Sequence, residues 1–83
     1  MTLHDRIRRV ASDVFGVPVS TLTSASSPDD VEQWDSLTHL TLAVAIESEF
    51  QVSLTDNDVM EMQSLSLIEA ILVERGVPSG AAR

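Results

Sequence analysis

Few side chains in this sequence have the types and spacing that covalent or acid–base chemistry needs. Ser36 and His39 lie about one helical turn apart in a stretch that we expect to be helical, which would bring a nucleophile near a base. Such a pair also needs a third group that orients the base, and a pocket around it. The sequence offers neither, so we expect no catalytic residue in this chain.

Acidic residues suggest a second kind of chemistry, the binding of a cation. Asp56, Asn57 and Asp58 are followed by Glu61, but the stretch lacks the central glycine and the twelfth-position glutamate of a calcium loop. Helix capping is the simpler interpretation, and we expect no metal site. The chain has no cysteine, which excludes disulfides, thiolate metal sites and a cysteine nucleophile.

Ser36 has two possible roles at the predicted start of a helix. Its hydroxyl could accept a backbone hydrogen bond as an N-cap. The same position favours a phosphate ester, because free N–H groups and the helix macrodipole stabilise negative charge there. From the residues alone, both a helix cap and a phosphodiester site remain open.

Apolar residues recur at steps of three and four, which predicts an all-α domain and argues against strands. Thr2 and Asp5 resemble a capping box at the start of a first helix, whose apolar stripe is Leu3, Ile7, Val10 and Val14. Asp35 and Ser36 precede a second helix, Ser64 should cap the last, and Gly76 and Pro78 should end it. We expect helices over about residues 3–15, 36–50, 56–62 and 65–75, with a long loop from Gly16 to Gln33 that covers one end of the bundle.

The second predicted helix has two apolar faces. At 100° per residue, one face collects Leu42, Ala45, Ile46 and Phe50, and the roughly opposite face collects Leu37, Leu40 and Val44. A domain this small can seldom bury both sides of a helix, so we expect the second stripe to be exposed and to contact a partner. Coverage of that stripe by a loop is the alternative.

Length, composition and charge restrict the class of protein. The chain has 83 residues with 43% apolar and 22% charged side chains, which fits one globular domain, assigned to residues 1–76, and a flexible tail at 77–83. No apolar run is long enough to span a bilayer and no secretory signal is visible, so we expect no membrane partner and a cytoplasmic location. A net charge of −8 without a basic recognition helix disfavours nucleic acid and favours basic partners, although the acidity could serve solubility alone.

One segment resembles the attachment-site helix of the acyl carrier protein family. The similar residues are Trp34, Asp35, Ser36 and Leu37, followed by Leu40, Leu42, Val44, Ile46, Glu47, Glu49 and Phe50. Residues 55–62 resemble the short third helix of that family and residues 64–73 the fourth, so the similarity covers about residues 3–76. The resemblance implies a four-helix bundle with three longer helices and one short third helix.

The resemblance also implies a function. Ser36 would receive 4′-phosphopantetheine from coenzyme A through a phosphopantetheinyl transferase, and the arm would carry acyl or aminoacyl groups as thioesters. The chain would be a monomeric carrier rather than an enzyme, with a loading ligase and acyl-processing enzymes as partners. Asp35 and Leu37 would be read by the transferase, while Leu37, Leu40, Val44 and Glu47 would form the partner face. Trp34 and His39 would help to choose the partner, unless Trp34 packs against the loop.

Departures from the family pattern bear on the pathway. Trp34 stands where the fatty-acid carriers usually have glycine, and Thr41 and Ser48 stand where those carriers often have acids. This pattern resembles free-standing carriers of specialised biosynthesis, which serve polyketide, peptide, fatty-acid or glycan modification. The alternative from another class is a small helical interaction domain in which Ser36 is only a helix cap.

Overall fold

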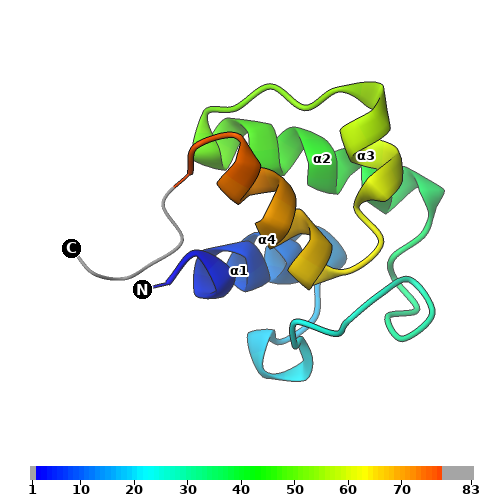
Figure 1. Ribbon diagram of the computed structural model, residues 1–83. Coiled ribbons are helices and arrows are strands. Elements are labelled where there is room, and N and C mark those ends of the chain that lie inside the picture. Colours follow the sequence, from blue (N-terminus) through cyan, green and yellow to red (C-terminus); the bar gives the residue numbers. More distant parts are fainter. Residues whose placement is uncertain (1, 78–83) are drawn as a thin grey trace.

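Helices make up most of the backbone that the structure, a computed structural model, describes, namely residues 2–77. They are α1 (Leu3–Phe15), α2 (Ser36–Phe50), α3 (Asp56–Glu61) and α4 (Leu65–Glu74), with a 3₁₀ turn, η1 (Val19–Thr21), between α1 and α2 (Figure 1). No strand occurs within this range. The predicted all-α bundle with a short third helix is therefore confirmed.

Helix α1 begins and ends as its sequence indicates. Thr2 and Asp5 form the predicted capping box, and Gly16 ends the helix in the left-handed region, with φ of 71°. The stripe buried along α1 is Leu3, Ile7, Ala11 and Phe15, whereas Val10 and Val14 are only half-buried. The prediction placed Val10 and Val14 on the central line, but a straight helix with 3.6 residues per turn brings the adjoining Ala11 and Phe15 inward.

The long loop is fixed to the helices at both of its sides. The Arg8 guanidinium donates to the carbonyl oxygens of Leu22 and Val19, each at 2.9 Å, and thereby holds η1 against α1. The Leu65 N–H donates to the Ser26 carbonyl at 3.2 Å, which satisfies one of the free donors at the start of α4. The loop covers one end of the bundle, as expected.

Helix α1 lies at the centre of the packing. It packs closely against α2 and α4, and α3 packs against α4. Their inward side chains, together with Leu22, Val31 and Trp34 of the loop, form one core. At the end of α4, Val77 packs against this core and its N–H donates to the Leu72 carbonyl at 3.0 Å. Val77 thus belongs to the packed domain rather than to the expected tail, while Pro78 and the remainder of that tail lie outside the described residues.

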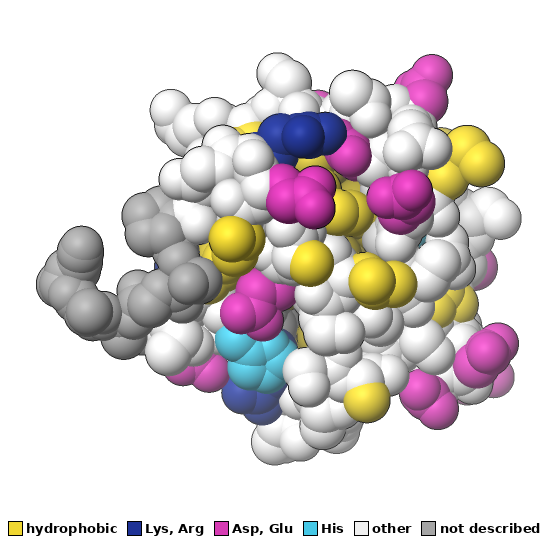
Figure 2. All heavy atoms as spheres, viewed as in Figure 1, with side chains coloured by type: hydrophobic (Ala, Val, Ile, Leu, Met, Phe, Trp, Pro, Cys, Tyr) yellow, Lys and Arg dark blue, Asp and Glu magenta, His cyan; other side chains and the backbone are white. Residues whose placement is uncertain are grey.

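Charge is separated along the molecule. Residues 10–74 contain no lysine or arginine, so the described basic side chains come from α1 and from Arg75 just after α4. The start of α2 lies at the right of Figure 1, and the right-hand margin of the same view in Figure 2 shows acidic side chains and no basic ones. Among the described residues, no helix has the length and apolarity that crossing a membrane would require.

Candidate functional site

The start of α2 is capped by Asp35 and not by Ser36. The Asp35 Oδ1 accepts hydrogen bonds from the backbone N–H groups of Leu37 and Thr38, both at 3.0 Å. The Thr38 hydroxyl in turn accepts from the Asp35 N–H at 2.9 Å, which completes a capping box. The interpretation of Ser36 as a helix cap is therefore wrong, because the preceding carboxylate already performs that function.

Ser36 presents a free hydroxyl at the first position of the helix. The residue is exposed, and within residues 2–77 its Oγ has no hydrogen-bond partner. The neighbouring hydroxyls differ, since Thr38 donates to the Gln33 carbonyl at 2.6 Å and Thr41 to the Leu37 carbonyl at 3.1 Å. On the first turns of α2, Ser36 alone has a hydroxyl that the described part of the chain leaves available.

The capping carboxylate is kept ionised beside Ser36. The backbone N–H of Thr38, followed by the Thr38 hydroxyl and the Leu37 N–H, holds the pKa of Asp35 below its usual value. Desolvation opposes this shift but does not cancel it. The start of α2 therefore carries a fixed negative charge next to the serine.

The second apolar stripe of α2 is exposed, as predicted. Leu37, Leu40 and Val44 are 74%, 59% and 64% exposed, so no loop covers them. On the opposite side Leu42, Ala43 and Ile46 are buried. The prediction placed Ala45 in the core instead of Ala43, although at 100° per residue Ala43 lies inside the arc that ends at Phe50 and Ala45 lies outside it.

Trp34 is a core residue, which corrects the expectation that it lies on the partner face. Its side chain is only 4% exposed and its ring packs on Phe15, with the ring centroids 5.1 Å apart. The alternative, in which Trp34 packs within the protein, is the one that the structure supports. An indole buries a large apolar area, so it stabilises the junction between the loop and α2.

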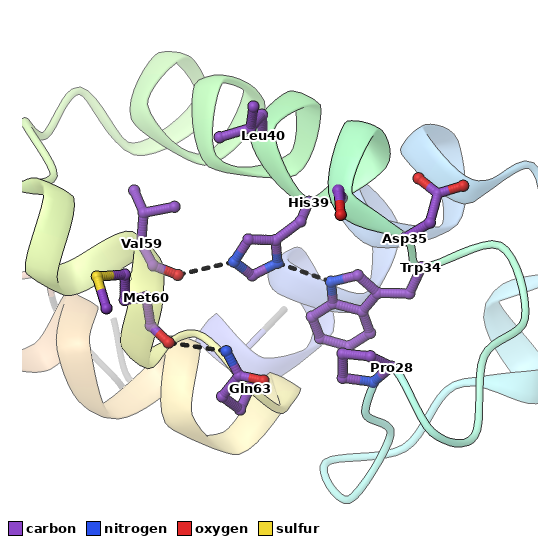
Figure 3. Close-up of a pocket in the computed structure, with 9 residues that line it drawn as sticks. Pro28, Trp34, Asp35, His39, Leu40, Val59, Met60 and Gln63 are labelled. Atoms are coloured by element: carbon purple, nitrogen blue, oxygen red, sulfur yellow. Dashed lines mark hydrogen bonds between the residues drawn. The ribbon is translucent and has the colours of Figure 1, made fainter.

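His39 has both ring nitrogens engaged. Its Nδ1 accepts from the Trp34 Nε1–H at 2.8 Å, and its Nε2 lies 2.7 Å from the Val59 carbonyl oxygen (Figure 3). Since a carbonyl only accepts, the hydrogen is on Nε2, and neither nitrogen is available to take a proton from Ser36. The sequence carried one signal of this, because His39 lies at 60° within the buried arc of α2 that runs from Leu42 to Ala43.

Glu47 has a structural contact in addition to its expected place on the partner face. Its Oε2 accepts the backbone N–H of Leu54 at 2.8 Å, and the side chain is half-buried. The carboxylate thus ties α2 to the segment that leads into α3.

An open groove of about 660 Å³ lies beside Ser36, between the first turns of α2, the loop and α3. Figure 3 shows Leu40 on one side and Val59 and Met60 on the other. The sequence analysis did not identify Met60 and Gln63 as site residues; the only signal was that Met60 is a large apolar side chain in a short helix, where it is 71% exposed. The groove is lined by Pro28, Trp34, Asp35, Ser36, His39, Leu40, Val59, Met60 and Gln63.

The acidic residues of α3 serve the helix and its neighbour. Asp58 accepts from the Thr55 N–H at 3.0 Å and pairs with Arg75, while the Asn57 amide donates to Glu61 at 3.2 Å. Among the described residues, no group of acidic or histidine side chains has the arrangement of a metal site. The capping interpretation of this stretch is confirmed, since Thr55 and Asp58 form a capping box.

Comparison with known families gives one match. A family model described as a phosphopantetheine attachment site matches residues 5–72. The matched range begins in the first turn of α1 and ends within α4. It includes Ser36, the capping box that precedes it and every residue that lines the groove.

Proposed function

We propose that Ser36 bears the prosthetic arm of this chain, which belongs to the phosphopantetheine attachment-site family of acyl and peptidyl carrier domains. Members of this family carry covalently attached 4′-phosphopantetheine, are modified by a phosphopantetheinyl transferase, and are carriers rather than enzymes. The terminal thiol of the arm would hold acyl or aminoacyl groups as thioesters.

The free hydroxyl of Ser36 is the observation that carries this assignment. Attachment needs an accessible oxygen, and Ser36 has one while Thr38 and Thr41 donate theirs to backbone carbonyls. The position also suits a phosphodiester, because the N–H at the first helical position has no partner within the helix and the macrodipole favours negative charge there. The residues present therefore fit the group.

The chain supplies the nucleophilic oxygen but not the base. The only histidine near Ser36 in sequence is His39, and both of its nitrogens are bonded to Trp34 and Val59. The carboxylate of Asp35 has its Oδ1 occupied by the helix cap. We infer that the proton of the serine hydroxyl passes to a base on the transferase, which agrees with a carrier that has no catalytic residue of its own.

The partner surface follows from the exposed side of α2. Leu37, Leu40 and Val44 form an apolar strip next to Ser36, and the acids near it, Asp35 among them, favour a basic partner. Enzymes that load or process the cargo would dock here for a short time, because a strip of this size suits a small, transient interface.

We assign the chain to a specialised biosynthetic pathway, as a cytoplasmic monomer. Support for the pathway comes from Trp34, Thr41 and Ser48, which replace the glycine and acids usual in fatty-acid carriers. Support for the monomer comes from the net charge of −8, which opposes self-association. Polyketide, peptide, fatty-acid and glycan modification all fit these features.

Intact mass spectrometry tests the assignment of Ser36. The purified protein is incubated with coenzyme A, magnesium and a broad-specificity phosphopantetheinyl transferase, and we expect a mass gain of one phosphopantetheine. Ser36→Ala should show no gain, whereas Ser48→Ala, which removes another exposed hydroxyl of α2, should behave as the wild type. A gain that persists in folded Ser36→Ala would move the site elsewhere, and no gain in folded wild-type protein with several transferases would contradict the carrier function.

A further inference from the structure

His39 joins three parts of the molecule through one side chain. It belongs to α2, its Nδ1 accepts the indole N–H of Trp34 at the end of the long loop, and its Nε2–H donates to the Val59 carbonyl of α3 (Figure 3). We call this pair of hydrogen bonds the His39 bridge. Each ring nitrogen has one role, so one tautomer of the ring satisfies both partners at once.

The bridge lies where backbone packing is sparse. The closely packed pairs among the described helices are α1 with α2, α1 with α4 and α3 with α4, so α2 and α3 are joined chiefly by side chains. His39 is the one that reaches the α3 backbone directly, within the hydrogen bonds of residues 2–77. Loss of the bridge would therefore loosen α3 from α2 more than loss of an ordinary surface contact.

The bridge is also where the groove beside Ser36 meets the core. Trp34, His39 and Val59 all line the groove. Trp34 is at the same time a core residue, and Val59 packs against the core. Farther inward, Ile46, Met62 and Leu72 have at most 1% of their surface exposed. A chain that left the groove for the core would have to pass this closed wall.

We propose that the His39 bridge closes the path from the groove to the core, and that this carrier therefore takes short or polar acyl groups, which stay in the open groove. The inference rests on the proposed attachment at Ser36. A long apolar chain that entered between α2 and α3 would part His39 from Val59 and Trp34. The Val59 carbonyl and the buried indole N–H would then lack partners away from water, which opposes entry.

The groove itself suits such a cargo. Leu40, Met60 and Pro28 offer apolar contact to a few carbons, and the Gln63 side chain, whose amide N–H donates to the Met60 carbonyl at 2.7 Å, adds a polar group. Because the groove is open, a thioester held there stays accessible to partner enzymes. A buried chain would instead need α3 to move before each transfer.

The single tryptophan provides a direct test in the wild-type chain. Acetyl-, 3-hydroxybutyryl- and octanoyl-phosphopantetheine are loaded onto the protein from the corresponding coenzyme A thioesters, and intact mass confirms loading. The indole N–H of Trp34 gives one nitrogen–proton NMR signal that reports the bridge. We expect this signal to keep the same chemical shift with all three groups, and the octanoyl chain to show nuclear Overhauser contacts with Leu40 or Met60 and none with Ile46 or Leu72.

The outcomes separate this inference from the proposed function. Failure to load a folded protein contradicts attachment at Ser36, whereas loading followed by a shifted indole signal and octanoyl contacts with Ile46 overturns only the closed bridge. His39→Leu, which removes both hydrogen bonds, should admit the octanoyl chain to Ile46, and His39→Gln, which can still donate to Val59, should admit it less. An octanoyl chain that stays in the groove of folded His39→Leu would show that packing alone closes the core. If His39→Leu does not fold, the wild-type comparison still decides.

Discussion

Asp58 shows how a single carboxylate can connect two helices. It is 7% exposed, accepts the Thr55 N–H within the capping box of α3, and pairs with Arg75 at the end of α4. The Thr55 N–H, followed by the Arg75 guanidinium, lowers the pKa of Asp58 below its ordinary value of 3.8. The folded protein therefore holds this proton less tightly than the unfolded chain does.

Stability should depend on the charge of Asp58. Because the folded pKa lies below 3.8, the carboxylate stabilises the fold above that pH, and the contribution is lost as the pH falls through the folded pKa. We expect Asp58→Asn to lower the Tm at neutral pH, and the difference from wild type to shrink below about pH 3. Thermal unfolding followed by circular dichroism at both pH values measures this.

The matched control is Asp29→Asn, which removes the same charge from an exposed position in the long loop. It should change the Tm little at either pH. A Tm difference for Asp58→Asn that stays constant from neutral to acidic pH would show that shape rather than charge explains the loss.

Ser36 and Trp34 illustrate how function and packing can alternate along one short segment. Trp34 is buried, Asp35 caps the helix and Ser36 is free, although all three are consecutive. The change of role at each step arises because the chain enters a helix here, where the side-chain direction turns by about 100° per residue. The functional oxygen is therefore held by a rigid helix start whose own hydrogen bonds are already satisfied.

At the scale of the element, α2 uses its two faces for different purposes. The inner face packs on α1 through Leu42, Ala43 and Ile46, and the outer face leaves Leu37, Leu40 and Val44 in solvent. A helix with one apolar face would need no partner. The outer face can contribute binding energy only when another protein covers it.

Leu40 and Leu42 form a matched pair for testing the two faces. Leu40→Asp should change the free energy of unfolding by no more than about 0.5 kcal/mol, since the side chain is exposed, but should lower kcat/KM for modification by the transferase. Leu42→Asp should destabilise the fold by more than about 3 kcal/mol, because it buries an unpaired charge. Unfolding curves and modification rates, measured together, check both. Loss of helical signal in Leu40→Asp would contradict the exposed face.

The His39 bridge also belongs to this scale, since it decides how α2 and α3 meet. Leaving the indole N–H and the Val59 carbonyl unsatisfied costs about 1–3 kcal/mol each, and burial of one methylene returns about 0.8 kcal/mol. A chain would have to bury between about three and eight methylenes before entry broke even, even without the work of opening the packed core. Octanoyl thus tests the closed bridge near the upper end of that range.

At the scale of the whole molecule, charge separation gives the carrier a direction. Residues 10–74 have no basic side chain, and the described arginines gather at α1 and the end of α4, while Asp29, Asp30, Glu32 and Asp35 precede Ser36. Such a field would turn the Ser36 end of the molecule toward a basic partner.

Modification by the transferase should therefore depend on salt. We expect kcat/KM to fall on the order of tenfold between low salt and physiological ionic strength, because steering acts on the association rate. Glu32→Gln should reduce kcat/KM at low salt, whereas Glu74→Gln, which removes an exposed acid at the opposite end of α2's neighbour α4, should not. A kcat/KM that does not change with ionic strength would rule out steering by this acidic end.

Local signals in the sequence determined the helices of this protein. Capping boxes, glycine and apolar spacing act over one or two turns, so Thr2 with Asp5, Gly16 and Ser64 mark helix ends without knowledge of the fold. The two faces of α2 were likewise visible, because periodicity along one helix needs no other element. The resemblance around Ser36, now matched by the family comparison over residues 5–72, identified the carrier class.

Tertiary structure alone decided how distant residues are paired. The bonds from His39 to Trp34 and Val59, from Arg8 to the loop, and from Asp58 to Arg75 join segments whose separation in sequence gives no periodic signal. They also decided that Trp34 is core rather than surface, and that Asp35, not Ser36, caps α2. Composition and spacing report which side of an element is apolar, but the identity of the partner depends on how the helices pack in three dimensions.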